Sequence, residues 1–143
     1  MMNYQSIRAK IEGPLLTAYN TQVPPVPVYF DNITAVPPDP PNEYVRINVT
    51  FGLTTESTLD GSLDYARGAL IIRCFAPKSA GPARCQQLIQ LAKQTLDTLN
   101  ATNKTSVATY VRTGAITGPS FQSPNDSPHF IGRIDTGWQA SVK

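Results

Sequence analysis

The sequence predicts an α+β domain in which a mostly antiparallel sheet of about four to five strands carries two helices packed on one face. Two segments show apolar residues every three or four positions, and three segments alternate apolar with polar residues. The order along the chain is helix, weak strand, hairpin, helix, hairpin, which places both helices on the same side of the sheet. With 143 residues, the chain has the size of one domain, so residues 1–143 are expected to form a single unit.

Residues 3–19 are expected to form the first helix. Apolar side chains recur there on one helical face, at Tyr4, Ile7, Ile11, Leu15 and Tyr19. Gly13-Pro14 interrupts the pattern, because a proline inside a helix lacks one backbone donor and clashes with the preceding turn. The sequence therefore predicts a kink at this point or two short helices in succession.

Residues 24–41 contain seven of the thirteen prolines, so this segment is read as an extended surface connection. Since proline cannot donate to a sheet ladder, the apolar strip from Val26 to Phe30 is at best an edge strand. The segment is either a stiff loop or a rigid arm laid on a neighbouring subunit. The second reading makes five residues candidates for a subunit interface: Pro24, Pro25, Val28, Phe30 and Pro38.

The clearest strand runs from residue 43 to residue 58. Its odd positions are apolar and are expected on the buried face: Val45, Ile47, Val49, Phe51 and Leu53. Turn-forming residues 59–64 and a second apolar run over residues 69–76 predict a long antiparallel hairpin with residues 71–75 in mid-sheet. Its tip is expected to project, which suggests docking on a partner. The docking candidates are Glu56, Leu59, Asp60, Asp64, Tyr65 and Arg67; the alternative is a solvated loop without a partner.

The second helix is expected to begin at Pro82, which suits a first helical turn, and to stop at Asn100. Its apolar stripe consists of Cys85, Leu88, Ile89, Ala92, Leu96 and Leu99. Two further strands are predicted over residues 106–115 and 129–142, separated by a loop over residues 117–128. Trp138 is expected to be buried in the last strand. The outward side of the strand over residues 106–115 adds Tyr110 and Arg112 to the interface candidates.

Residue chemistry argues against an enzyme. The single histidine, His129, has no metal-ligating companions near it in the sequence. No glycine-rich phosphate loop is present, and Cys74 and Cys85 are expected to be reduced thiols in the core. No catalytic residue, metal or cofactor is therefore predicted.

Composition points to protein partners. Charged residues make up only 15% of the chain, against about 25% in ordinary domains. Polar uncharged side chains in their place give surfaces that desolvate at little cost, as subunit interfaces require. The net charge of +2 is too small and too dispersed to act as an electrostatic footprint for nucleic acid. DNA binding is therefore not expected, and no sequence-specific nucleic-acid partner is predicted. No apolar segment is long enough to span a bilayer and no signal peptide is recognised, so no membrane partner is expected.

Several of these segments together resemble the bacteriophage tail terminator family, small proteins that cap the head-proximal end of a completed tail tube. The matching features are the opening helix from Tyr4 to Arg8, the proline-rich loop and the strand that begins with residues 43–47. The clearest is the run Gly68-Ala-Leu-Ile-Ile-Arg-Cys-Phe-Ala-Pro77, which ends just before a helix. A final strand with Trp138 completes the resemblance.

The resemblance implies a structural, non-enzymatic virion protein that forms a hexameric ring. Such a ring stops polymerisation of the tail tube protein and offers a docking surface to the head-tail connector or neck protein. It would lie at the head-proximal end of the virion tail after assembly in the host cytoplasm, with room for DNA in its lumen. Two alternatives stay open: another ring-forming tail or neck component, such as a head-tail stopper or tube protein, and a small cytoplasmic α+β binding module.

Overall fold

The computed structural model describes residues 4–22, 25–31, 43–56, 64–80, 82–102, 109–125 and 128–142. It contains two long helices, α1 (Tyr4–Asn20) and α2 (Pro82–Thr102), and a short 3-10 turn, η1 (Lys78–Ala80). The strands are β1 (Val28–Tyr29), β2 (Tyr44–Glu56), β3 (Asp64–Pro77), β4 (Thr109–Gln122) and β5 (His129–Val142). The predicted α+β class is confirmed: five strands form one mostly antiparallel sheet with two helices packed against it.

The sheet has the order β1-β2-β3-β5-β4. Only the two-residue β1 runs parallel to its neighbour; the other pairs are antiparallel. The predicted hairpin of β2 and β3 is confirmed, and so is the weak edge strand near Val28. β3 lies in the middle of the sheet; it pairs with β5 along its whole length, from Asp64 to Pro77, and with β2 from Asp64 to Phe75.

The core lies between the inward face of the sheet and the two helices. Helix α1 contributes four fully buried side chains at the predicted positions, Ile7, Ile11, Leu15 and Tyr19. Each fully buried aliphatic side chain stabilises the fold by roughly 1.5–3 kcal/mol. Trp138 of β5 is buried as predicted, and its indole nitrogen donates a hydrogen bond to the carbonyl of Ala69 at 3.2 Å.

Helix α1 runs without interruption through Pro14, so the alternative of two short helices is wrong. Gly13 and Pro14 are both exposed, and nothing lies within 4 Å of the Cβ that Gly13 lacks. Because this turn faces water, solvent can satisfy the carbonyl that the proline leaves without a donor. The helix therefore keeps its buried face across the proline.

Helix α2 extends past the predicted stop at Asn100 to Thr102. The Asn100 side chain forms bonds with β4: its amide oxygen accepts from the backbone nitrogen of Thr113 at 2.9 Å, and its amide nitrogen donates to the Thr113 carbonyl at 3.2 Å. A residue type that ends many helices is used here to join a helix to a strand edge.

Strand β4 is longer than predicted, because it continues to Gln122 through part of the expected loop. Its pairing with β5 shifts register between Thr113 and Ile116 and again between Thr117 and Ser120. These irregularities accommodate Gly118, with a φ of 102°, and Pro119, joined by a cis peptide bond. Proline is tolerated here because β4 is an edge strand.

Candidate docking surface at the distal end of the sheet

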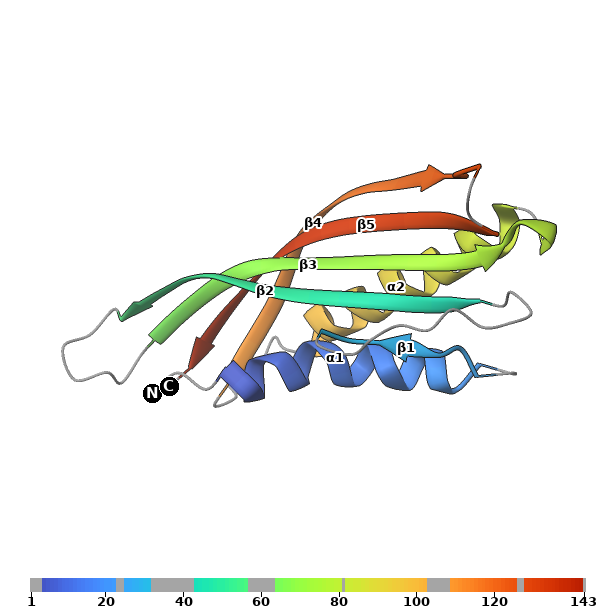
Figure 1. The fold of residues 1–143 in the computed structure, drawn as a ribbon. Helices are drawn as coiled ribbons and strands as arrows, with labels where there is room; N and C mark the ends of the chain where they lie inside the picture. The colour runs from blue at the N-terminus through green and yellow to red at the C-terminus, as the bar shows by residue number, and fades with distance from the viewer. Residues whose placement is uncertain are drawn as a thin grey trace.

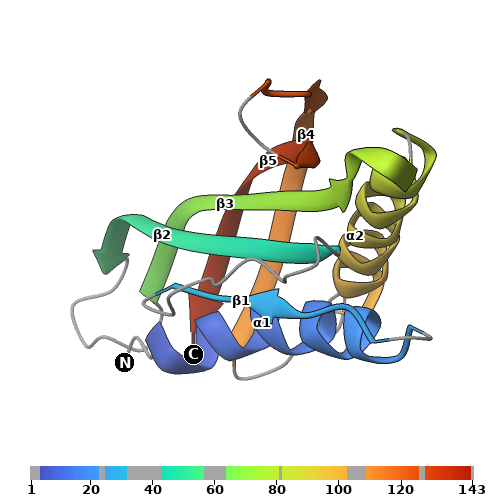
Figure 2. The same cartoon turned by 45° about the vertical axis from the view of Figure 1, so that its right-hand side comes forward.

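Large exposed side chains gather at one end of the sheet, the distal end, where β2 finishes at Glu56 and β3 begins at Asp64. The end of β2 projects past the first turn of α1 (Figures 1 and 2). Four residues form what we call the distal cluster, with these exposed fractions: Tyr4 47%, Phe51 37%, Leu53 50% and Tyr65 46%. Tyr4 and Phe51 lie on the inward side of this end, and Leu53 and Tyr65 lie on the outward side. Large exposed apolar patches are typical of interaction sites.

A β-bulge at Gly52 creates part of this cluster. Phe51 pairs with Gly68 while Leu53 pairs with Arg67, so β2 has one residue more than its partner at this point. The extra residue reverses the alternation, because side chains in a strand point to opposite faces with a period of two. The expectation that Leu53 faces the core is therefore wrong: it lies on the outward face of the sheet, beside Arg67.

Phe51 stays on the inward side and links the distal cluster to the core. Its ring lies 5.2 Å from that of Tyr4 and 5.1 Å from that of Trp138, both edge to face, and the guanidinium of Arg8 lies 5.6 Å from its centre. Phe51 was expected to be buried, yet 37% of it is exposed. Phe51 lies opposite the first turns of α1, where Tyr4 and Arg8 cover only part of its ring.

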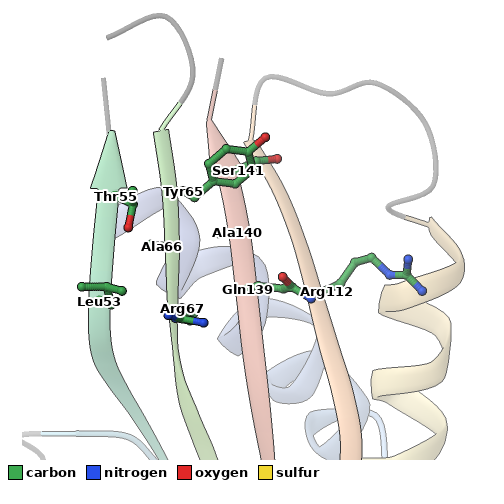
Figure 3. A pocket seen from close by; sticks show the side chains of 9 residues that line it. All are labelled: Leu53, Thr55, Tyr65, Ala66, Arg67, Arg112, Gln139, Ala140 and Ser141. Carbon is green, nitrogen blue, oxygen red and sulfur yellow. The ribbon is translucent and has the colours of Figure 1, made fainter. Parts of the chain in front are cut away.

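The outward side of the distal end contains a hollow of about 380 Å³ (Figure 3). Strand register builds it from two rows: Leu53, Arg67, Gln139 and Arg112 lie side by side across four strands, and Thr55, Tyr65 and Ser141 form the next row. Arg112 reaches beyond the β4 edge, away from β5 (Figure 3). Arg67 therefore lies among apolar and hydroxyl-bearing side chains, and Arg112 forms the rim of the hollow at the β4 edge.

The structure brings together residues that the sequence placed in two separate sites. Tyr65 and Arg67 were candidates for tube docking and Arg112 for a subunit interface, and all three line this hollow. The other docking candidates lie at or beyond the strand ends. Glu56 and Asp64 terminate β2 and β3, though their side chains are outside the described part, as are the whole residues Leu59 and Asp60.

The remaining interface candidates are scattered. Val28 and Phe30 are half-buried and pack against the chain's own core. Pro25 is exposed, whereas Pro24, Pro38 and the side chain of Tyr110 lie outside the described part.

Six residues that line the hollow were not among the predicted site residues: Leu53, Thr55, Ala66, Gln139, Ala140 and Ser141. The signal for Leu53 was Gly52, since a glycine inside an alternating strand often marks a bulge. Gln139 and Ser141 could be placed on the outward face from the alternation of β5. Their approach to Leu53, however, depends on the strand order, which the sequence does not reveal.

Side chains cover the backbone of both outer long strands near their middle. The Asp31 carboxylate accepts from the Val49 backbone nitrogen at 3.0 Å, from Asn48 at 2.7 Å and from Arg8 at 2.6 Å. Burial alone raises the pKa of Asp31, but these hydrogen bonds outweigh it and hold the pKa below its ordinary value. Asn100 covers Thr113 of β4 in the same manner.

No catalytic constellation is evident in the described part of the chain. No three residues of the metal-ligating types His, Cys, Asp or Glu come together there, and neither described helix is long and apolar enough to cross a membrane.

His129 is buried, and its ring packs edge to face against that of Tyr44, with the ring centroids 5.2 Å apart. Cys74 and Cys85 are buried free thiols as predicted, and burial raises their pKa values to about 12 and about 11. They therefore stay protonated and poorly nucleophilic at neutral pH.

Comparison with known proteins supports the fold and leaves function open. No protein-family model matches the sequence, and no curated protein matches it. One solved structure, of a protein whose name describes no activity, shares the fold with a TM-score of 0.63 at 23% sequence identity. The match covers 98% of this chain and 96% of that one, so the likeness extends over the whole domain.

Proposed function

We propose that this chain is a bacteriophage tail terminator: a structural protein that forms a ring of six on the completed tail tube, ends tube polymerisation and receives the head connector. The proposal starts from the sequence resemblance described above. The clearest segment of that resemblance, residues 68–77, forms most of the central strand β3 and leads through η1 into α2.

The observation that carries the proposal is the distal cluster. Of the large apolar residues exposed in the described part of the chain, four lie at this end and only Leu16, 43% exposed, lies on the middle of α1. Leu53 and Tyr65 adjoin Arg67 and Arg112, and a combination of aromatic, aliphatic and arginine side chains is characteristic of protein interfaces. The distal end is therefore the part of the chain best suited to docking on the tube.

Ring closure requires two different patches on each subunit, since neighbours meet head to tail. Strand addition is an unfavourable route at the middle of the sheet edges, because Asp31 covers β2 at Val49 and Asn100 covers β4 at Thr113. Neighbouring subunits would therefore meet through side-chain contacts, with Arg112 among the contacting residues. Such contacts are weak in isolation, so we expect a monomer or a weak equilibrium in dilute solution and a stable ring only on the tube.

The test is a capping assay with the tail tube protein from the same genome, followed by negative-stain microscopy. Addition of the wild-type chain should stop tube growth and give tubes of limited length. The double variant Leu53→Ser/Tyr65→Ser should allow tubes to overrun, whereas Leu16→Ser, a matched change on α1, should cap like the wild type. Tubes that grow equally long with and without the wild-type chain contradict the proposal.

A second candidate is the small binding module, which the distal hollow favours. Its volume of about 380 Å³ falls within the range of about 300–1,000 Å³ typical of small-molecule sites. A cytoplasmic metabolite with an anionic group would fit the two arginines that line it. A metabolite library screened by thermal shift separates the two candidates: a stabilising ligand whose effect disappears in Arg67→Gln supports the module.

A further inference from the structure

Folding gathers arginines that are scattered along the sequence onto one face of the sheet. Arg46 of β2 lies directly opposite Arg73 of β3, and Arg73 lies directly opposite Arg133 of β5. We call these three residues the arginine row. Each is flanked in its strand by residues on the buried inward face, so all three point outward, away from the helices. Adjacent strands are about 4.8 Å apart, so the row spans about 10 Å.

The outward face carries a clear excess of positive charge. Arg67 and Arg112 lie on the same face, in the distal hollow, and Arg67 precedes Arg73 by six residues on β3, about 20 Å along the strand. Asp135 is the one acidic residue at the outward strand positions in the described part of the chain, and it pairs with Arg133 at 2.7 Å. On the helices, Arg84 and Lys93 are each paired with a carboxylate.

The arginines of the row are close enough to repel one another. Burial first, and then the charges of Arg133 and Arg46, lower the pKa of Arg73 below its ordinary value. Asp135 offsets part of this by raising the pKa of Arg73. The hydrogen bond that Arg73 donates goes to a neutral group, the amide oxygen of Asn48 at 3.0 Å. Among the described residues, Arg46 has no ion pair. A negatively charged ligand would relieve this repulsion.

A recess between two arginines of the row suits a phosphate group. It has a volume of about 140 Å³ and is lined by Arg73, Phe75, Ser120, Gln122, Ile131 and Arg133. Guanidinium groups bind phosphate oxygens in a bidentate manner, and serine and glutamine side chains are common phosphate contacts. The recess therefore offers two charged and two neutral groups able to bond phosphate oxygens.

We propose that the outward face of the sheet, centred on the arginine row, binds the phosphate backbone of double-stranded DNA irrespective of sequence. Besides the arginines, the outward positions are rich in the uncharged types that contact phosphate, among them Asn48, Thr50, Thr117, Ser120, Gln122 and Gln139. The inference concerns the single chain and goes beyond the proposed function, which it does not require.

Other occupants fit the face less well. Two copies placed face to face would bring their arginine rows together, and the centre of a protein interface is usually depleted of charge. Single strands bind on exposed aromatic rings. Tyr44 is buried, and its ring stacks on that of Phe75 with the ring centroids 4.3 Å apart. Among the described residues of the outward face, Tyr65 is the one aromatic residue that is largely exposed. A face that carries positive charge but no row of exposed aromatic rings favours the phosphate backbone of a duplex over a single strand.

The experiment measures fluorescence anisotropy of a labelled 30-base-pair duplex with the full chain at 50–200 mM salt. If three to five arginines contact phosphates, the plot of log affinity against log salt should have a slope between about −2.7 and −4.5. The variant Arg46→Gln/Arg73→Gln should lose at least about tenfold in affinity at 50 mM salt, and its slope should become shallower by about 1.8. A duplex of unrelated sequence should bind equally well.

The matched control is Lys10→Gln/Lys93→Gln, which removes the same charge from the two helices. It should change affinity less than about twofold, and the melting temperature of each variant checks that it is folded. If the arginine variant does not fold, Arg133→Gln takes its place, with a slope shallower by about 0.9. No binding at 50 mM salt, or equal losses in the arginine and lysine variants, overturns the proposal. Because no tube protein is present, a failure here is distinct from a failure to cap tubes.

Discussion

The two faces of the sheet are built from the same strands and have opposite chemistry. In β3 the inward residues Leu70, Ile72 and Cys74 are fully buried, whereas their outward neighbours Ile71 and Arg73 are only partly covered. The inward face is closed by the chain's own helices. Neither described helix covers the outward face, which holds the arginine row and the distal hollow. The difference indicates that inward residues maintain the fold and outward residues are available for partners.

The largest difference in stability is expected between substitutions at two glycines in adjacent strands, which test the comparison between the two faces. A Cβ on Gly68 would lie 1.9 Å from the Thr50 carbonyl oxygen and 2.8 Å from the Trp138 ring, whereas one on Gly137 would lie 3.7 Å from its nearest neighbour. Gly68→Ala should therefore destabilise the chain by more than about 3 kcal/mol or prevent folding. Gly137→Ala should change the free energy of unfolding by less than about 0.5 kcal/mol. Urea denaturation measures both, and similar losses would contradict the division between the faces.

The next effect concerns Trp138 and its outward neighbour Gln139. Trp138→Ala removes a buried ring that contacts Phe51 and should cost about 3–5 kcal/mol of the free energy of unfolding. Gln139→Ala, one residue along the same strand, should cost less than about 0.5 kcal/mol. Trp138 should also fluoresce as a buried indole. Emission typical of full exposure to water would show that the inward face is not closed at this point.

An intermediate effect is expected at Asn100, which joins α2 to the β4 edge. Asn100→Ala leaves the backbone groups of Thr113 without their partner and should cost about 1–3 kcal/mol. Asn100→Asp keeps an acceptor for the Thr113 nitrogen but loses the donor to its carbonyl, so it should fall between the wild type and Asn100→Ala. Hydrogen exchange at the Thr113 amide should quicken in Asn100→Ala, whereas Asn100→Asp, which keeps the acceptor, should retain most of the protection. Unchanged exchange in Asn100→Ala would mean that the edge is protected by something else.

A smaller loss of stability is expected at alkaline pH, where the two buried thiols of the inward face begin to lose their protons. The pKa values of Cys74 and Cys85, about 12 and about 11 in the folded chain, lie above the value of about 8.5 for an exposed thiol. Above pH 8.5 the unfolded chain therefore holds fewer protons than the folded one, so stability is full below that pH and declines toward pH 12. Melting temperatures between pH 8 and 11 measure the decline. Cys85→Ala should show a shallower decline than the wild type, and identical curves would contradict the burial of this thiol.

The smallest effect on stability is expected at the distal hollow. Leu53→Ser and Tyr65→Ser should each change the free energy of unfolding by less than about 0.5 kcal/mol, because both side chains are about half exposed. A loss above about 2 kcal/mol in chemical denaturation would assign these residues to the core.

The sequence predicted what depends on local periodicity. Both helices, the β2–β3 hairpin and the burial of Trp138 follow from apolar spacing, and the structure confirms them. The errors arose where one residue changes the register. The bulge at Gly52 moved Leu53 to the other face, and two shifts in β4 turned part of a predicted loop into strand.

The outward surfaces could not be predicted, because they depend on strand order. Arg46 and Arg73 meet within the β2–β3 hairpin, but Arg133 joins them only when β5 pairs with β3. The same pairing joins Arg67 to Gln139 in the hollow. The net charge of +2 conceals this gathering, since ion pairs elsewhere balance much of the remaining charge.

The central claim, that the distal end of the sheet docks on a tail tube, is tested most directly by hydrogen exchange with and without tubes of the matching tube protein. The account predicts protection on tube addition in peptides that cover residues 51–56 and 64–67, with little change in α2. Protection confined to α2, with the distal ends of β2 and β3 exchanging as in the free chain, would contradict it.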